Sequence, residues 1–212
     1  MPNRLIWLDF ETMGVDPTQC AVIDMSIAWA DVSVMLSDKP YTCRYVSNIK
    51  KFKISIEDQV KKYKYVVEPE TLTFWQEQSS EARKAIKPSS ADLKLEEFCW
   101  SLIETMNDIG KADYWFTRGN NFDPLILQRI FKSVGKSHIF NEYFTFYKVQ
   151  DMRTFINAKL DYPHTTNMCP IKDEDFWNKI FVQHDSRWDV LADLMRYQTI
   201  IRLENDLDQP QR

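Results

Sequence analysis

The sequence predicts an α/β protein in which a mixed β-sheet is flanked by α-helices. Three apolar runs of strand length open the chain, at residues 5–10, 20–34 and 41–49, and short turn-forming segments separate them. Segments with helical periodicity follow, and two further short strands alternate with helices. Strands joined by turns pair antiparallel, and strands joined through a helix can pair in parallel. We therefore expect an antiparallel three-strand meander extended by parallel strands.

The later elements are assigned from helical periodicity and from residues that begin or end helices. Expected helices span residues 70–86, 91–107, 124–135, 152–160 and 188–203, and expected strands span residues 114–117 and 144–149. Ser79 and Ser80 can divide the first helix, and Gly110 should end the second. Asp123 falls at the N-cap of the third helix, before Pro124.

Length and composition indicate one folded domain over residues 1–212, with a polar tail from about residue 204 that should fray. A hydrophobic content of 44% excludes a disordered chain. Only four glycines are present, and neither a Walker-type phosphate loop nor a dinucleotide fingerprint occurs. The net charge of −4 argues against a nucleic-acid coat protein, although local basic patches suffice for a nucleic-acid enzyme.

The cysteines and the N-terminus point to a cytoplasmic protein. Cys20, Cys43, Cys99 and Cys169 form no C-x-x-C pair, so we expect free thiols in a reducing compartment. The chain runs into its first strand without a signal peptide, and no apolar run is long enough to span a membrane. We therefore expect a soluble intracellular protein without a membrane partner.

Two carboxylates, Asp9 and Glu11, interrupt the end of the first strand. Alternate residues of a strand face the same side, so the two acids lie on one face about 6–7 Å apart along the strand. Ionised and unpaired in a buried strand they would be unstable, so they need a cation or a shared proton. A pair of divalent metals about 3.5–4 Å apart would neutralise them.

Two more acids and a histidine are candidates to complete such a site. Asp123 follows a strand and opens a helix, although it could be an ordinary N-cap. Asp189 starts the last helix, although with Ser186 it also fits a capping box. His184 precedes Asp189 by five residues, and a neutral imidazole could take a proton from an attacking water. Four acids and one histidine in these positions match the requirements of two-metal hydrolysis.

These segments, in this order and spacing, resemble the DEDDh superfamily of 3′–5′ exonucleases. The matching residues are Asp9-Phe-Glu-Thr12, then Phe122-Asp123, then His184 with Asp189. Thr71-Leu-Thr-Phe-Trp75 and Asp151-Met-Arg-Thr154 are similar to the branch that contains phage exonuclease A and the small bacterial exoribonucleases. The resemblance implies a ribonuclease-H-like fold, and host cytoplasm as the location if a phage encodes the chain.

The resemblance also implies the role of each acid. Asp9 would bridge two divalent ions, Mg²⁺ or Mn²⁺. Glu11 and Asp189 would hold the ion on the nucleophile side, and Asp123 would hold the second ion, partly through water. His184 would be the general base.

The resemblance further implies contacts to the terminal nucleotides. The backbone at Thr12 and Met13 would wedge against the last nucleotide. The remaining candidate contacts are Trp75, Gln78, Asn121 and Phe122. Trp75 could instead belong to the core, because an aromatic residue at helical spacing usually packs.

The expected function is a metal-dependent 3′–5′ exonuclease that releases nucleoside monophosphates from the 3′ ends of single-stranded nucleic acid, with DNA slightly favoured over RNA. An exoribonuclease that trims RNA 3′ ends is the alternative, and a binding module without catalysis is a further one. The lysine-rich segment 50–64 is either a solvated surface or a track for phosphates. A homodimer is a possible assembly, because some relatives dimerise.

Overall fold

The computed structural model describes residues 3–37, 45–160, 171 and 173–207. Its centre is a five-stranded sheet in the order β3-β2-β1-β4-β5. The strands are β1 (Arg4–Thr12), β2 (Val22–Asp31), β3 (Ile49–Lys53), β4 (Tyr114–Thr117) and β5 (Val149–Asp151). β1, β2 and β3 pair antiparallel, and β4 and β5 extend the sheet in parallel from β1. The predicted mixed sheet is confirmed.

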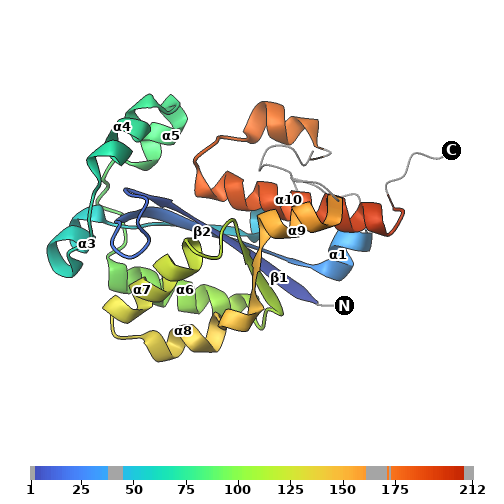
Figure 1. Ribbon diagram of the computed structural model, residues 1–212, viewed down its shortest axis with the longest axis horizontal. Coiled ribbons are helices and arrows are strands. Elements are labelled where there is room, and N and C mark those ends of the chain that lie inside the picture. The colour runs from blue at the N-terminus through green and yellow to red at the C-terminus, as the bar shows by residue number, and fades with distance from the viewer. Residues whose placement is uncertain (1–2, 38–44, 161–170, 172, 208–212) are drawn as a thin grey trace.

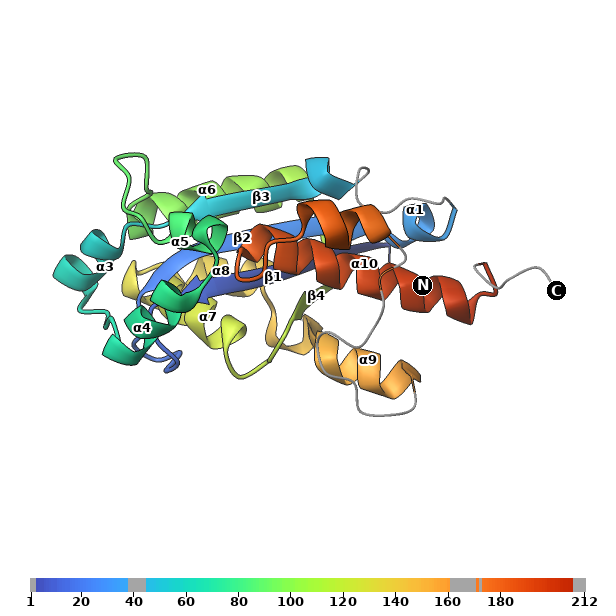
Figure 2. The ribbon, with the colours of Figure 1, turned by 90° about the horizontal axis from the view of Figure 1, so that it is seen from above.

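Helices cover both faces of the sheet (Figure 1). They are α1 (Val32–Ser37), α3 (Ile56–Tyr63), α4 (Pro69–Glu77), α5 (Ser80–Ala85), α6 (Leu95–Ile109), α7 (Asp123–Ser133), α8 (Ser137–Tyr143), α9 (Met152–Leu160) and α10 (Ser186–Glu204). α6, α7 and α8 pack on one face, and α10 lies along the other, as the view from above shows (Figure 2). The fold is a three-layer α/β/α arrangement.

The side-chain alternation of β1 places the acids on the α10 face. Ile6 and Leu8 point into the core under α6 and α7, whereas Leu5 and Trp7 point into the core under α10. Asp9 and Glu11 continue the second series, because alternate residues share a face. Pairing of β1 with β4 ends at Trp7, so both acids lie beyond the last parallel pair. The polar residues therefore begin where the packed part of the sheet ends.

The strand boundaries differ from the prediction at three places. The apolar run expected to be a strand to residue 34 leaves the sheet at Asp31 and becomes α1. Periodicity cannot separate a fully buried strand from a buried helix, and β2 is buried on both faces. The third strand is Ile49–Lys53, and residues 38–44 lie outside the described part. The fifth strand begins at Val149, because Phe146–Lys148 form a 3-10 turn.

Besides α1, the helix predictions missed the short helices α3 and α8, and four of the predicted starts differ from the observed ones by one to four residues. α3 and α8 are only 8 and 7 residues long, shorter than the stretch over which a helical period is usually recognised. The predicted break at Ser79–Ser80 does separate α4 from α5, and Gly110 ends α6 with a φ of 79°. That helix begins only at Leu95. α7 begins at Asp123, one residue before the predicted start, so Asp123 is not its N-cap.

Two cysteines lie within the described residues, and both are free buried thiols. Burial raises the pKa of Cys20 to about 11 and that of Cys99 to about 12. Cys43 and Cys169 lie outside the described residues. Across the described ranges, no helix combines the length and the apolar character needed to cross a bilayer.

Candidate active site

Three carboxylates converge at the end of β1. Oxygen atoms of Asp9, Glu11 and Asp189 all lie within 4.8 Å of one another. β1 supplies the first two from alternate positions, and the first turn of α10 supplies the third. α10 can bring Asp189 there because its apolar residues pack along the Leu5–Trp7 face of the sheet. The helix and the strand meet where the apolar residues of β1 give way to acids.

Asp123 lies on the other side of β1, at the start of α7. Its carboxylate accepts a hydrogen bond from the Phe10 amide at 3.3 Å. That amide lies beyond the last residue of β1 that pairs with β4. The loop after β4 thus returns the chain to the free edge of β1. Asp123 is buried, and its carboxylate is hydrogen-bonded to the backbone of β1 although the residue itself lies at the start of α7.

The segment before α10 presents His184. The residue has a φ of 62°, in the left-handed region, which is uncommon for a side chain other than glycine. The predicted Ser186–Asp189 capping box is absent: Asp185 caps α10 by accepting from the Arg187 amide. His184 meets two aromatic rings edge-to-face, Phe74 with centroids 5.1 Å apart and Trp75 at 6.2 Å. Its place is therefore set by a tight turn and by α4.

All five predicted catalytic residues line one cavity of about 600 Å³. The cavity adjoins a second one of about 560 Å³ that contains the end of β1 and the start of α4. Phe10, Glu11, Phe122 and His184 line both cavities. The acids thus lie at one end of a continuous cleft, and His184 lies where the two cavities join.

Burial and mutual repulsion raise the pKa values of the acids. Burial is the main cause of the raised pKa of Asp9, and Asp123 and Glu11 add repulsion. Burial, then Asp189, raises the pKa of Glu11. Burial raises the pKa of Asp123 and that of Asp189 to about 7. Four acids that resist ionisation in one place need a cation to be charged together.

Burial lowers the pKa of His184, so its imidazole is neutral at pH 7. Among the described residues, no hydrogen bond is made to this ring. A neutral imidazole has one nitrogen free to accept a proton. His184 therefore has the protonation state that a general base requires.

An arginine–aspartate cluster beside the acids was not predicted. Arg118 donates from Nε to Asp193 Oδ2 at 2.7 Å, and Arg196 donates to Asp193 Oδ1 at 3.0 Å. Both arginines line the cavity that holds the acids, as does the exposed Arg153. Asp193 follows Asp189 by four residues on one helix, so helical spacing could have indicated it. Arg118 lies in the loop after β4, and its pairing depends on tertiary contacts that no spacing reveals.

Hydrogen bonds fix the backbone at Thr12, which lines the second cavity, and at the buried Met13. Trp75 donates from its indole nitrogen to the Thr12 carbonyl at 3.0 Å. The Met13 amide donates to Ala21, and its carbonyl accepts from Glu68. Trp75 is only 1% exposed, so the packing alternative describes its position. The indole fixes the backbone at the end of β1.

The remaining predicted contacts occupy different parts of the site. Asn121 and Phe122 line the catalytic cavity. Gln78 ends α4, where its amide donates to the Phe74 carbonyl, and it lines neither cavity. Phe74 was not predicted; it is 40% exposed and lines the second cavity beside His184. Its ring, rather than that of Trp75, is available to a ligand.

The acids fit a pair of divalent cations. Hard cations such as Mg²⁺ take carboxylate oxygens as ligands, and these four acids supply only such oxygens. Asp9, Glu11 and Asp189 are close enough to share one ion, and Asp123 could hold a second ion with Asp9 from the other side. The raised pKa values of Asp9 and Glu11 reflect burial and mutual repulsion, and bound cations would offset both.

The raised pKa values predict that the metal-free protein loses stability as pH rises. An acid with a higher pKa in the folded state holds an extra proton when folded, so a rise from about pH 4 to about pH 7 favours unfolding. The pKa of about 7 for Asp123 and Asp189 sets the upper end of this window. In EDTA we expect the Tm to fall by roughly 5–10 °C between about pH 5.5 and about pH 8.

Thermal melts with and without Mg²⁺ test this expectation. Mg²⁺ should raise the Tm more at the higher pH, because it binds the ionised acids. The lowered pKa of His184 acts in the opposite sense, since a neutral folded histidine gains stability as pH rises toward about 6.5. One histidine opposes several acids, so the fall should persist. A flat Tm, or an equal Mg²⁺ effect at both pH values, would contradict the assignment.

Comparison with known proteins connects this geometry to a family. The family model for the 3′–5′ exoribonuclease Rv2179c-like domain matches residues 4–178. This range includes Asp9, Glu11 and Asp123 and ends before His184. An exodeoxyribonuclease of Enterobacteria phage T4 is 29% identical over 216 residues, which cover 95% of this chain and 90% of the phage protein.

Solved structures show the same fold. *E. coli* exonuclease I, in complex with a 5cy-dA13 oligonucleotide, matches with a TM-score of 0.59 at 13% identity over 92% of this chain. Cell-death related nuclease 4 matches with a TM-score of 0.58 at 17% identity over 95% of this chain and 64% of its own. The chain spans 40% of that exonuclease I chain. The expected ribonuclease-H-like fold is confirmed, and the chain belongs to the 3′–5′ exoribonuclease Rv2179c-like family, among the DEDDh 3′–5′ exonucleases.

Proposed function

We propose that this chain hydrolyses single-stranded nucleic acid from the 3′ end and releases nucleoside monophosphates with the help of two divalent ions. The observation that carries the proposal is the convergence of Asp9, Glu11 and Asp189 within 4.8 Å. Asp123 and His184 line the same cavity. This residue set matches the needs of phosphodiester hydrolysis at a metal centre.

The acids and the histidine have separate roles in this proposal. Asp9 would hold both ions, Glu11 and Asp189 would complete one ion site, and Asp123 would complete the other. The ions, Mg²⁺ or Mn²⁺, would supply charge stabilisation and an activated water. His184 takes the proton of the attacking water, for which its lowered pKa suits it.

The second cavity is the proposed seat of the terminal nucleotide. It begins at Thr12 beside the acids and is bounded by Phe74, whose exposed ring can stack on a base. The buried indole of Trp75 donates a hydrogen bond to the Thr12 carbonyl and does not contact the base in this proposal. Asn121 and Phe122 border the scissile bond on the other side. A terminal nucleotide seated there would place its phosphodiester bond beside the acids, which favours cleavage at a terminus.

We propose DNA as the favoured substrate, with RNA as the alternative. The phage relative is named an exodeoxyribonuclease and is similar over 95% of this chain. The family description names an exoribonuclease, so the two comparisons differ on the sugar. Discrimination needs a contact to the 2′-hydroxyl. The side chains that line the second cavity, Glu70 and Thr71 among them, are the candidates for such a contact.

Digestion of matched DNA and RNA strands of one sequence, each carrying a 5′ label, tests the proposal. With Mg²⁺ we expect a ladder that shortens from the 3′ end, mononucleotide products, and faster loss of the DNA strand. Faster loss of RNA would transfer the assignment to the exoribonuclease alternative. Binding of either strand without any metal-dependent cleavage would leave only the binding module.

A further inference from the structure

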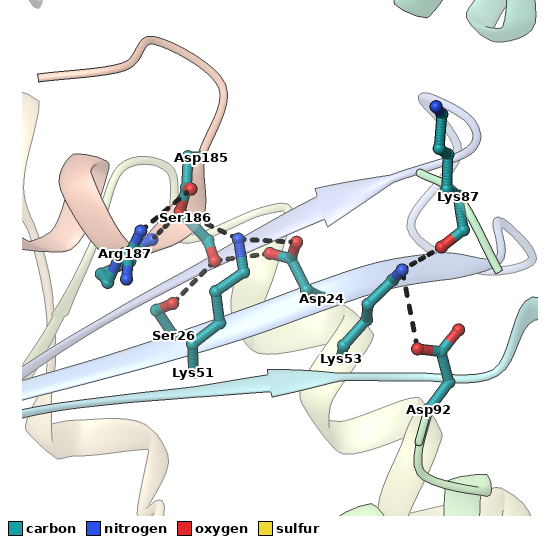
Figure 3. A network of polar contacts seen from close by, with 9 residues as sticks. All are labelled: Asp24, Ser26, Lys51, Lys53, Lys87, Asp92, Asp185, Ser186 and Arg187. Atoms are coloured by element: carbon teal, nitrogen blue, oxygen red, sulfur yellow. Dashed lines mark hydrogen bonds and ion pairs between the residues drawn. The ribbon is translucent and has the colours of Figure 1, made fainter. Parts of the chain in front are cut away.

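A buried polar network joins three elements beside the candidate active site (Figure 3). Asp24 and Ser26 occupy alternate positions of β2, and both side chains are fully buried. Lys51 lies on β3 opposite Ser26 and reaches across the strands toward the start of α10. Charged and hydroxyl side chains that are this deeply buried need partners.

The partners of Lys51 lie on two different elements. Its Nζ atom is 3.0 Å from Asp24 Oδ2 and 2.8 Å from Asp185 Oδ1. Ser186, also fully buried, donates to Asp24 Oδ1 and lies 2.7 Å from Ser26 Oγ. One lysine therefore connects β2 and β3 to the first residues of α10.

This network ends at the residue that follows His184. A left-handed conformation is unfavourable for a residue that carries a side chain, and it persists where the surrounding structure holds it. On the network side, Asp185 is held by Lys51 and caps α10. On the other side, the imidazole meets the ring edges of Phe74 and Trp75. Because no hydrogen bond from a described residue orients the ring, its direction depends on the backbone that carries it.

The network also places a positive charge among the acids. Asp24 is the direct cross-strand neighbour of Glu11. An unpaired charge on Asp24 would repel Glu11, and Lys51 counters both acids. Asp24 raises the pKa of Glu11 and Lys51 lowers it, so the lysine offsets part of the repulsion that this buried acceptor for Ser186 brings to the acids of β1.

We propose that Lys51 is a positioning residue for His184. By clamping Asp24 and Asp185, it holds the left-handed turn at His184 so that the imidazole faces the Asp9–Glu11–Asp189 cluster. The inference rests on the proposed role of His184 as the general base. The alternative is that Lys51 only stabilises the fold and has no effect on the position of His184.

Strand β3 offers a matched control in Lys53. Lys51 and Lys53 have similar side-chain exposures, 23% and 27%. Lys53 bonds the Lys87 carbonyl and lies 3.6 Å from Asp92, away from α10 (Figure 3). Lys51→Met removes the ion pairs to Asp24 and Asp185, whereas Lys53→Met removes the one to Asp92. Both variants take a positive charge from the same strand, and only the first removes a contact to the His184 turn.

Steady-state kinetics and a double-variant test separate positioning from stability. We expect Lys51→Met to lower kcat by about 10- to 100-fold with KM within about threefold, because small misplacements of a catalytic group have effects of this size. Lys53→Met should stay within about twofold of wild type. In a His184→Ala background, Lys51→Met should cause no further loss, because residues that act through one another are not additive. An equal loss in both backgrounds would overturn the proposal.

An NMR measurement tests the same inference without relying on activity. The chain contains only three histidines, so their imidazole signals can be resolved individually. The rings of Phe74 and Trp75 shift the His184 signal, and displacement of the imidazole changes that shift. In the metal-free protein, Lys51→Met should move the His184 signal and leave that of His138 in place. An unchanged His184 signal would overturn the proposal.

A second variant covers the case in which Lys51→Met does not fold. Asp24→Asn combined with Lys51→Met removes both charges, so no buried acid is left unpaired. It should show the same shift of the His184 signal and the same fall in kcat. If wild type proved inactive on every strand, the proposed function would fail, and the NMR result would still decide the role of Lys51. If His184→Ala kept full activity, the base assignment would fail separately.

Discussion

His184→Ala is expected to lower kcat by roughly 10²–10⁴-fold, because removal of a general base forfeits that much of the rate. The imidazole lines the cavity that holds the acids, and burial keeps it neutral. It makes no contribution to the carboxylate cluster itself, so Mg²⁺ affinity should change little. Steady-state kinetics measure the first effect, and calorimetric titration with Mg²⁺ measures the second.

His138→Ala is the matched control, because that imidazole is exposed on α8 and lines neither cavity. It should keep wild-type kcat. Near-normal turnover of His184→Ala would refute the base assignment. A large loss of Mg²⁺ affinity would show instead that His184 acts on the metals.

Asp9→Asn is expected to abolish turnover more completely, with a loss of about 10⁴-fold or more, because both ions lose a ligand. Asp9 is the acid whose pKa is raised by burial and then by Asp123, Glu11 and Asp189 together. Removing its charge relieves that repulsion, so the metal-free variant should melt at a higher temperature than wild type at about pH 8. Activity and stability should thus change in opposite directions.

Asp108→Asn provides the control, because Asp108 is exposed on α6, on the opposite face of the sheet. It should leave both kcat and Tm near wild type. Calorimetry with Mg²⁺ should show weakened binding only in Asp9→Asn. An active Asp9→Asn variant would contradict the bridging role, and a destabilised metal-free variant would contradict the repulsion that the pKa values describe.

The sequence was sufficient to predict the sheet and the acids because both depend on local patterns. Alternation along β1 is visible in the order of residues, and it places Asp9 and Glu11 on one face whatever the rest of the fold does. The end of α6 at Gly110, and the start of α7 to within one residue, follow from rules that act within a few residues. Strand order β3-β2-β1 follows from antiparallel neighbours.

The missed features depend on contacts between distant segments. Arg118 and Asp193 are 75 residues apart, and only the fold shows that they pair. From the sequence, Trp75 could belong to the core or contact a ligand. Its hydrogen bond to Thr12, 63 residues away, is visible only in the fold. Ser186 fitted a capping pattern, but its hydroxyl bonds Asp24 on a strand 162 residues earlier. A local rule fails where a tertiary partner satisfies the same polar group.

The lysine-rich segment shows the same limit. As a sequence it was open to two interpretations, a solvated surface or a phosphate track. In the structure Lys51 pairs with Asp24, and Lys53 contacts Asp92 and the Lys87 carbonyl. Lys61 pairs with Glu57 on α3. These three side chains are engaged with the protein itself. Spacing along the chain can indicate the i,i+4 pair of Lys61 with Glu57, but not the partners of Lys51 and Lys53, which lie on other segments.

Cleavage of linear and circular single strands tests the central claim most directly. The claim is that the acid cluster and His184 form a metal-dependent site that acts at a free 3′ end. With Mg²⁺, a linear DNA strand should be degraded to nucleoside monophosphates while a circular strand of the same sequence stays intact, and EDTA should stop the reaction. Cleavage of the circle, or degradation of the linear strand in EDTA, would contradict the account.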